Sequence, residues 1–302
     1  MIAVLGSANM DLVMEVERIP RPGETVLGRR VQRYPGGKGA NQAAAAARLG
    51  EEVAFFGKVG RDAFGEEILD HLRRDGIDVR AVERDAERPT GLAGIWVDEA
   101  GENAIACASG ANASVDANYV DRVLDRLRAA DVLLLQFEIP LETIAHLLRA
   151  LPSERPTVIV DPAPAREISA LPLERIDVLT PNRSELQLLT GEPDVHAAAR
   201  ALLDRGVRAV LCKLGDQGAC WVGDETVCVG AVPVQTVDTT AAGDAFNGAL
   251  AGALGRRSIE GAIRWANVAG ALATTRRGAQ PSLPRRAAVE RVLRQMTGED
   301  CT

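Results

Sequence analysis

The sequence predicts an α/β protein built on a largely parallel sheet. Short apolar runs of the kind that form strands buried on both faces alternate with longer segments of helical spacing. This alternation is typical of right-handed β-α-β crossovers. The apolar runs lie at 2–5, 53–56, 132–136, 157–160, 178–179 and 209–213.

Three helices are predicted with their ends. An alanine-rich segment over 41–50 stops at Gly50, and a second pattern over 64–74 stops near Gly76. A last helix is expected in the tail, 287–302. The 302 residues contain no repeat or low-complexity linker, so we expect a single domain over 1–302.

Two regions interrupt the alternation, at 11–34 and 92–108. In the second, apolar residues at 95–97 face those at 104–106 across a polar turn, which is typical of a hairpin. We expect the two regions to pair as a small antiparallel sheet that forms a lid over one end of the body. The alternative is surface decoration, because periodicity does not say where a hairpin docks.

Charge and hydropathy exclude several kinds of partner. The 35 Lys and Arg against 42 Asp and Glu give a net charge of -7, and no block of like charge suits a nucleic acid or an anionic membrane. The N-terminus lacks a basic region before an apolar stretch, and no run of about 18 apolar residues follows. We therefore expect no nucleic-acid partner, no membrane insertion and a cytoplasmic location.

The cysteines and histidines give no sign of a metal centre or a disulfide framework. The five cysteines form no C-x-x-C pair, and the three histidines lie far apart. We expect the thiols to be reduced and mostly buried in the packing. These residues are Cys107, Cys212, Cys220, Cys228 and Cys301, with His71, His146 and His196.

Polar residues follow several of the predicted strands, where open α/β sheets place their ligands. Asn9 and Asp11 lie two apart in an extended segment and can point the same way. An amide beside a carboxylate suits sugar hydroxyls, although both residues also favour turns. The glycine-rich stretch Pro35-Gly-Gly-Lys-Gly-Ala-Asn41 precedes the alanine-rich helix and permits close approach of a ligand to Gly37, Lys38 and Asn41.

Three further strand ends carry polar groups. Glu138 follows the run at 132–136. Asn182 and Glu185, three apart at a helix start, fit either a capping box or a carboxylate that orients the water shell of Mg²⁺. The stretch Lys213-Leu-Gly-Asp-Gln-Gly218 fits either a nucleotide-phosphate loop or a hairpin turn.

The segment Val237-Asp-Thr-Thr-Ala-Ala-Gly-Asp244 precedes an Ala/Leu-rich helical pattern. Free backbone N–H groups gather at a helix N-terminus, so this segment predicts an anion site with the Asp244 carboxylate beside it. The alternative for Asp244 alone is a cap or a partner of the helix dipole. Neither G-x-G-x-x-G nor G-x-x-x-x-G-K-[ST] spacing occurs here, which disfavours a dinucleotide-dependent dehydrogenase and a Walker-type NTPase.

Four of these stretches together resemble the ribokinase-like (PfkB) carbohydrate kinases. They are Asn9-Met-Asp11, Gly36-Gly-Lys-Gly-Ala-Asn41, Thr180-Pro-Asn-Arg-Ser-Glu185 and Asp238-Thr-Thr-Ala-Ala-Gly-Asp244. The likeness extends from about Met1 to Pro284. It implies a three-layer α/β/α core with a small β lid, and ATP-dependent phosphorylation of D-ribose at O5.

The resemblance also implies a role for each matching residue. Asp244 is the catalytic base, and Ala241, Ala242 and Gly243 offer N–H groups to the transferring phosphoryl group. The sugar is held by Asn9, Asp11, Gly37, Lys38, Asn41 and Glu138. The ATP site comprises Asn182, Lys213, Leu214, Gly215, Asp216, Gln217, Gly218, Gly243 and Asn267, while Glu185 organises the Mg²⁺ shell.

A monovalent-cation site for K⁺ and a homodimer that pairs through the lid follow from the same likeness. The K⁺ ligands are Asp238, Thr240, Ala273, Arg276, Gly278 and Ser282. One departure stands out, because many family members have Gly-Ala-Gly-Asp where this chain has Ala241-Ala242-Gly243-Asp244. Alanine keeps its N–H but disfavours positive φ, and we expect the change to be compatible with activity.

Alternatives from other classes remain open at this point. Within the family, the acceptor can be another sugar or a nucleoside, as in a fructokinase, a deoxyribose kinase or a pseudouridine kinase. From a different class, the chain can be a sugar-binding regulator on a kinase fold, because a fold alone does not fix function.

Overall fold

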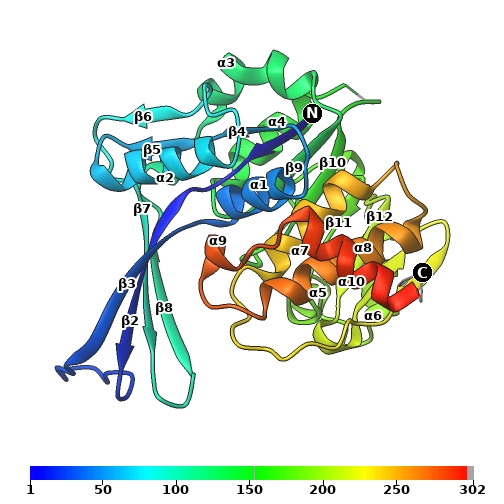
Figure 1. The fold of residues 1–302 in the computed structure, drawn as a ribbon. Coiled ribbons are helices and arrows are strands. Elements are labelled where there is room, and N and C mark those ends of the chain that lie inside the picture. Colours follow the sequence, from blue (N-terminus) through cyan, green and yellow to red (C-terminus); the bar gives the residue numbers. More distant parts are fainter. Residues whose placement is uncertain (153, 298–302) are drawn as a thin grey trace.

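A computed structural model of the chain describes residues 1–152 and 154–297. Its centre is an eight-stranded sheet (Figure 1). The strands are β1 (Ile2–Leu5), β4 (Val53–Phe56), β9 (Val132–Gln136), β10 (Thr157–Asp161), β11 (Val178–Leu179), β12 (Ala209–Lys213), β13 (Ala219–Val222) and β14 (Thr226–Val229). They lie in the order β14-β13-β12-β11-β10-β9-β1-β4.

Strands β1, β4 and β9 to β12 run parallel, and β13 and β14 form an antiparallel edge. The predicted α/β class with a largely parallel sheet is confirmed. Every predicted apolar run coincides with a strand, and the run at 157–160 extends by one residue to Asp161.

Helices cover both faces of the sheet. They are α1 (Lys38–Arg48), α2 (Ala63–Arg74), α3 (Ala117–Arg128), α4 (Leu141–Ala150), α5 (Arg183–Thr190), α6 (Val195–Asp204), α7 (Ala242–Ala253), α8 (Ile259–Ala273), α9 (Ala279–Ser282) and α10 (Arg286–Thr297). Because successive strand residues point to opposite faces, β1 contributes Ile2 and Val4 to one core and Ala3 and Leu5 to the other. Helices α1, α2, α7 and α8 bury the first core, and α3 to α6 bury the second.

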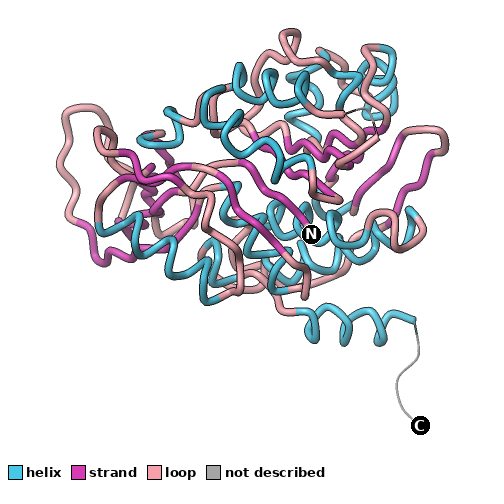
Figure 2. Tube along the Cα trace, turned by 90° about the horizontal axis from the view of Figure 1, so that it is seen from above, coloured by secondary structure: helices cyan, strands magenta, loops and turns pink. Residues whose placement is uncertain are grey.

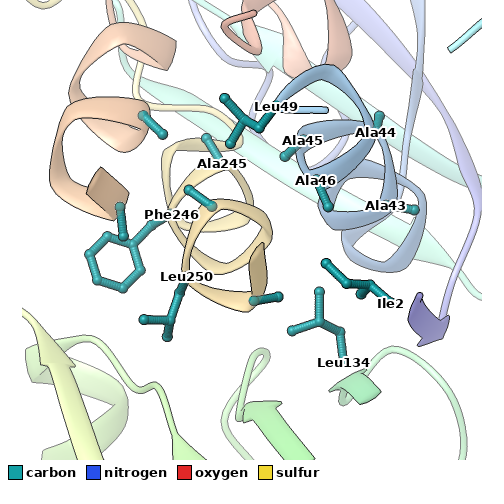
Figure 3. Packing of buried hydrophobic residues seen from close by; sticks show 14 of the residues in the cluster. Ile2, Ala43, Ala44, Ala45, Ala46, Leu49, Leu134, Ala245, Phe246 and Leu250 are labelled. Atoms are coloured by element: carbon teal, nitrogen blue, oxygen red, sulfur yellow. The ribbon is translucent and has the colours of Figure 1, made fainter. Parts of the chain in front are cut away.

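Helices α1 and α7 pack closely because small residues line their contact. Figure 3 shows Ala45 and Ala46 of α1 facing α7, with Ile2 and Leu134 of the sheet close by. A Cβ on Gly248 of α7 would come within 2.6 Å of the Ala45 Cβ. The close packing holds the starts of both helices near each other. Helix α1 begins at Lys38, three residues earlier than the predicted start at Asn41, because Gly37 adopts φ 87° and caps it.

The chain changes direction across the sheet at β1. From β1 it proceeds to β4 on one side, and later returns to β9 on the other side. The loops that leave the carboxyl ends of β1 and β9 therefore diverge, and doubly wound sheets bind ligands near such a point. Asn9 and Glu138 follow these two strands directly.

A second sheet projects from the body, and Figures 1 and 2 show it extending away from the helices. It contains β2 (Asn9–Val16), β3 (Gly28–Gly36), β7 (Gly91–Val97) and β8 (Asn103–Ala108), in the order β3-β2-β7-β8. Strands β5 (Lys58–Gly60) and β6 (Glu83–Asp85) form a separate parallel pair.

The expectation that the two inserted regions pair as an antiparallel sheet is wrong for their central contact. Each region is an antiparallel hairpin, but β2 and β7 pair in parallel, with Asn9 opposite Gly91 and Glu15 opposite Val97. The physical reason is that both strands start at the body and run outward from it. The mixed sheet that results has its buried base at Asn9, Asp11 and Gly91.

The expectation that all thiols are reduced is also wrong. Cys220 and Cys228 form a disulfide, because the β13–β14 hairpin places them directly opposite each other. Cys212 is a buried free thiol, as expected, but Cys107 is free and exposed. Cys301 lies outside the described residues. In the described part of the chain, no helix is long and apolar enough to cross a membrane.

Candidate active site

A cavity of about 770 Å³ opens at the N-terminus of α7. Its wall is formed by residues from the carboxyl ends of β10 and β12, the segment after β14, and helices α7 and α8. Many of the residues that the sequence predicts as functional lie together here. They are Lys38, Asn182, Glu185, Lys213, Gly215, Asp216, Gly218, Ala241, Ala242, Gly243, Asp244 and Asn267.

Asp244 lies in the first turn of α7, yet it does not cap the helix. Residue 241 is the N-cap, and no side chain caps this terminus. The Asp244 carboxylate is buried, at 5 % exposure, and is held by two amides of α1. Asn41 Nδ2 donates to Oδ2 at 2.9 Å, and Gln42 Nε2 donates to Oδ1 at 3.1 Å. A carboxylate can accept about four hydrogen bonds, so Asp244 retains capacity toward the cavity.

A chain of polar contacts links Asp244 to the part of the cavity wall formed by the ends of β10 and β12. Gln42 Nε2 also donates to Asp161 Oδ2 at 3.0 Å, and Lys213 Nζ pairs with Asp161 Oδ1 at 2.8 Å. Behind them, Gln136 Nε2 donates to Gln42 Oε1 at 2.8 Å. The network is not fully satisfied, because Gln136 Oε1 is buried without a hydrogen-bond partner, but the bonds that it contains restrict the side chains that they join. The base candidate is thus anchored to three strands and two helices of the body.

The charges around Asp244 shift the pKa values of the site. Burial, the largest cause, raises the pKa of Asp244; Lys38 opposes the shift and Asp161 adds to it. Burial on its own lowers the pKa of Lys38, but the surrounding carboxylates, with Asp244 the strongest, outweigh it and hold that pKa above its ordinary value. Lys38 is therefore charged, and Asp244 is a stronger base than an exposed aspartate.

The start of α7 presents unpaired donors to the same cavity. Ala241 adopts φ 59° and ψ 10°, and in the described part of the chain it is the one residue other than glycine with positive φ. The N–H of Ala242 donates to the Thr239 carbonyl at 3.2 Å. Among the described residues, the N–H groups of Ala241, Gly243 and Asp244 have no acceptor within the chain. Free N–H groups at a helix N-terminus bind anions such as phosphate.

The predicted sugar-binding residues gather at the base of the second sheet. Asn9 and Asp11 are 6 % and 8 % exposed, and Asn112 Nδ2 donates to Asn9 Oδ1 at 2.7 Å. The chain at Gly37 passes close to the backbone of Asn9. Only glycine fits there, because a Cβ on residue 37 would lie 2.7 Å from the Asn9 nitrogen. Glu138 accepts from the Ser7 hydroxyl and, at 2.9 Å, from the Lys38 N–H. Ser7 and Asn112 were not among the predicted residues.

The carboxyl of Asp11 has an unusual pKa. Burial, together with the nearby charges of Glu138 and Asp244, raises it to about 7. Asn41 adds an unpaired group, because its Oδ1 is buried without a hydrogen-bond partner. A buried acceptor without a partner is costly, and a sugar hydroxyl is a donor that would satisfy it.

Asn182 and Glu185 form the capping box of α5. Asn182 Oδ1 accepts from the Glu185 N–H, and Glu185 Oε2 accepts from the Asn182 N–H, each at 2.8 Å. Both residues also line the cavity. Glu185 has one oxygen left for another partner, and burial, opposed by Lys213, raises its pKa. The capping box therefore does not prevent Glu185 from also orienting the water shell of Mg²⁺.

The remaining predicted nucleotide residues differ in their surroundings. Leu214 packs against the second core, and Gln217 accepts from Arg183 at 2.7 Å. Residues 215–217 form a 3-10 turn that joins β12 to β13. Asn267 Nδ2 donates to the carbonyls of Val229 and Gly230, at 3.1 Å each. Asn267 thus holds in place the segment that forms one wall of the cavity.

The predicted cation ligands are partly brought together by Asp238. Its Oδ1 accepts from the Thr240 N–H at 2.9 Å, and its Oδ2 accepts from the Gly278 N–H at 2.9 Å. Burial raises the pKa of Asp238, but the bond from the Thr240 hydroxyl, at 2.6 Å, and the two backbone bonds outweigh it and leave the pKa below its ordinary value. Ser282 Oγ donates to the Ala279 carbonyl at 2.8 Å. Ala273 is buried and Arg276 is exposed.

Comparison with known proteins places the chain in a family. Residues 1–286 match the pfkB family carbohydrate kinases. The ribokinase of Bacillus subtilis is 39 % identical over 294 residues, covering 97 % of this chain and 99 % of that protein. The chain therefore belongs to the pfkB family of carbohydrate kinases, and it is an enzyme of this class.

Solved structures agree with that assignment. The Thermotoga maritima ribokinase has a TM-score of 0.90 at 39 % identity and covers 97 % of this chain and 99 % of its own. The Arabidopsis thaliana ribokinase, solved in complex with ribose and ATP, has a TM-score of 0.87 at 35 % identity and covers 97 % of this chain and 98 % of its own. Within the family, the chain is thus similar to ribokinases over nearly its full length.

Proposed function

We propose that this chain transfers the γ-phosphoryl group of ATP to O5 of D-ribose, with Asp244 as the general base. The observation that carries the proposal is the position of the Asp244 carboxylate. It is buried, held on both oxygens by Asn41 and Gln42, and located between the free N–H groups of α7 and the polar base of the second sheet. The similarity to ribokinases supports ribose as the acceptor.

In this mechanism Asp244 accepts the proton of the sugar's primary hydroxyl as its oxygen attacks phosphorus. The two amides fix the carboxylate in one orientation, so little reorganisation is needed when the proton moves. The raised pKa of Asp244 brings its basicity closer to the operating pH. Asn9, Asp11, Gly37, Asn41 and Glu138 position the other hydroxyls.

The free N–H groups at the start of α7 stabilise the transferring phosphoryl group. Ala241 and Gly243 supply the donors, and Ala242 shares its N–H with Thr239. Lys38, which is half-buried and charged near Asp244, adds a positive charge at the cavity. Phosphoryl transfer depends mainly on positioning and on charge stabilisation, and this arrangement provides both.

The ATP molecule would occupy the cavity along the wall formed by Asn182, Lys213, Gly215, Asp216 and Gly218. Its volume of about 770 Å³ lies within the usual range for small-molecule sites, roughly 300–1,000 Å³. Glu185 has a carboxylate oxygen available toward the cavity, which fits the hydration shell of Mg²⁺. Bound Mg²⁺ would neutralise charge on the phosphates.

A monovalent cation such as K⁺ would lie at Asp238 and the neighbouring carbonyls. The set proposed is Asp238, Thr240, Ala273, Arg276, Gly278 and Ser282. Asp238 is ionised and forms bonds to both Thr240 and Gly278, so its oxygens and the adjacent carbonyls offer hard ligands. The cation would steady the segment that leads into the donors of α7 without contacting the substrates.

The second sheet would act as the lid over the sugar and as a dimer contact in a cytoplasmic enzyme. Met14 of β2 and Val31 of β3 are exposed apolar side chains that lie opposite each other on one face of the sheet. Apolar groups clustered on a sheet commonly mark an interface, so we propose that two chains associate through these sheets. Sedimentation of a Val31→Glu variant should then give a monomer where the parent chain gives a dimer.

The test of the proposed reaction is ADP release from Mg·ATP, with K⁺ present, across D-ribose, 2-deoxyribose, fructose, adenosine and pseudouridine. We expect the largest kcat/KM for D-ribose, with phosphate at O5 of the product by NMR. Replacing K⁺ by a bulky organic cation should lower the rate. A clear preference for another acceptor would retain the kinase and reject ribose, whereas sugar binding without turnover would favour a regulator.

A further inference from the structure

Three cysteines form a row across one face of the sheet, at the edge opposite β4. The register places Cys212 of β12 opposite Cys220 of β13, and Cys220 opposite Cys228 of β14. Residues directly opposite on neighbouring strands point to the same face. Cys212 and Cys220 are buried, whereas Cys228 is exposed, so the row leads from the interior to the solvent.

His196 completes a group of ligands at the exposed end of this row. It is the second residue of α6, which packs on the same face as Cys212 and Val222. A ring nitrogen of His196 and the sulfurs of Cys220 and Cys228 all lie within 4.8 Å of one another. The sequence analysis found no metal cluster, because these three residues come from separate elements and only the fold brings them together.

We propose that His196, Cys220 and Cys228 bind a thiophilic divalent cation such as Zn²⁺ when the cysteine pair is reduced. Two thiolates and an imidazole are the ligand types that Zn²⁺ prefers, in a tetrahedral arrangement. Three protein ligands leave the fourth position to water, and His196 and Cys228 are exposed to the solvent that would supply it. Cys212 stands one strand further in and is not part of the group.

The disulfide and the metal site exclude each other. A dithiol reductant transfers two electrons and two protons to the Cys220–Cys228 disulfide, which yields two thiols while the reductant becomes a disulfide. The cation then binds both sulfurs as thiolates, and two protons are released to solvent. Oxidation of the pair removes both sulfur ligands, so only the reduced chain binds the cation.

This site is separate from the cavity at α7, because neither cysteine nor His196 lines that cavity. Cys228 is followed directly by Val229, whose carbonyl accepts from Asn267. The cation would therefore hold β13, β14 and the start of α6 together behind the cavity wall. The proposal depends on these side chains alone and does not require the proposed reaction.

The experiment is a titration with Co²⁺ as a spectroscopic probe. The chain would carry Cys212→Ala, which removes the neighbouring thiol, and would be reduced with a phosphine and desalted without oxygen. We expect one Co²⁺ per chain, with a thiolate-to-cobalt charge-transfer band and the intense visible bands of tetrahedral coordination. Zn²⁺ should displace the Co²⁺ and raise the melting temperature of the reduced chain, because it binds only the folded state.

Matched variants separate this site from adventitious binding. Cys228→Ser should abolish the charge-transfer band, and His196→Ala should weaken Co²⁺ binding by at least about tenfold. Cys107→Ser and His146→Ala remove an exposed thiol and a partly exposed imidazole elsewhere, and both should leave the titration unchanged. Circular dichroism of each variant would establish that it is folded.

Three results would overturn the proposal. The first is a weak octahedral Co²⁺ spectrum from the folded, reduced chain. The second is equal Co²⁺ affinity in the folded Cys228→Ser or His196→Ala variant. The third is the same stoichiometry and spectrum after the pair has been reoxidised to the disulfide.

Discussion

The start of α7 and the projecting sheet of β2, β3, β7 and β8 differ in which side chains they bury and which they expose. Around α7, polar side chains are buried and paired with one another through Asn41, Gln42 and Asp161. On the sheet, apolar side chains are exposed, with Leu27 at 87 % and Val31 at 63 %. The first region has most of its partners within the chain, whereas the apolar side chains of Leu27 and Val31 leave most of their surface to the solvent.

This difference implies a division of labour in the proposed kinase. The body of the molecule would hold Asp244 and the N–H groups at the start of α7 in fixed positions, because a buried network tolerates little displacement. In the proposed mechanism the sheet would contribute sugar contacts at its base, where Asn9 and Asp11 are buried, and a cover further out. Changes in the body should therefore act on kcat, and changes at the base of the sheet should act on sugar binding.

The largest effect should come from Asp244→Asn. The variant retains the shape of the side chain but removes the proton acceptor, so we expect kcat to fall about 10²–10⁴-fold while the Kd for the sugar changes little. Steady-state kinetics and calorimetric sugar binding would measure the two quantities. Asp204→Asn, an exposed residue at the end of α6 that does not line the cavity, is the matched control and should retain full activity. Comparable turnover in Asp244→Asn would remove Asp244 from the role of base.

Gly36→Ala tests the base of the sheet. A Cβ at residue 36 would lie 2.2 Å from Asp11 Oδ2, so the carboxylate must move. Displacement of a positioning group by about 1 Å can cost about 10²-fold, and we expect a loss of this order in kcat/KM, mostly through the sugar KM. In the Gly94→Ala variant of β7 the added Cβ has no neighbour closer than 3.5 Å, so kcat/KM should hardly change. Equal losses in both variants would mean that the sheet is merely destabilised.

A smaller effect is expected from pH. The pKa of Asp11 is raised to about 7, and its ionised form is the better acceptor for sugar hydroxyls. Sugar affinity measured without ATP should therefore weaken several-fold as the pH falls through 7, and Asp11→Asn should bind weakly at every pH. A pH-independent Kd in the parent chain would separate Asp11 from sugar binding.

Folding stability should respond to Asp11 in the opposite direction. The folded pKa lies above the unfolded value of 3.8, so the folded chain binds the proton more tightly. The contribution of Asp11 to stability is full below 3.8 and is lost as the pH rises through 7. The same carboxyl thus favours folding when it is neutral and sugar binding when it is charged, and urea unfolding at several pH values would measure the first effect.

The parts of the molecule that the sequence predicts are those that depend on local pattern. The apolar runs marked the six parallel strands of the main sheet to within a residue, but not β13 and β14, and glycines marked the ends of α1 and α2. Contacts between distant segments could not be predicted in this way. Gln42 joins Asp244 to Asp161 across three elements, and the registers of β2 with β7 and of β13 with β14 decide the mixed sheet and the disulfide. No local pattern encodes those registers.

The smallest effect is expected at Ala241, where the local pattern and the structure disagree. Ala241 adopts φ 59°, a conformation that costs an L-residue roughly 1–2 kcal/mol and glycine much less. Ala241→Gly should therefore raise the free energy of unfolding by about 1 kcal/mol, measured by urea denaturation, with kcat changed only a few-fold because the N–H donor remains.

The neighbouring residue provides the control for this last prediction. Ala242 begins α7 with an ordinary helical φ, so Ala242→Gly adds only flexibility and should lower the free energy of unfolding. If the two variants change the free energy of unfolding in opposite directions, the turn that leads into α7 is held under strain by the rest of the protein. If both variants shift stability in the same direction, the strain at Ala241 is not what sets the stability of this turn.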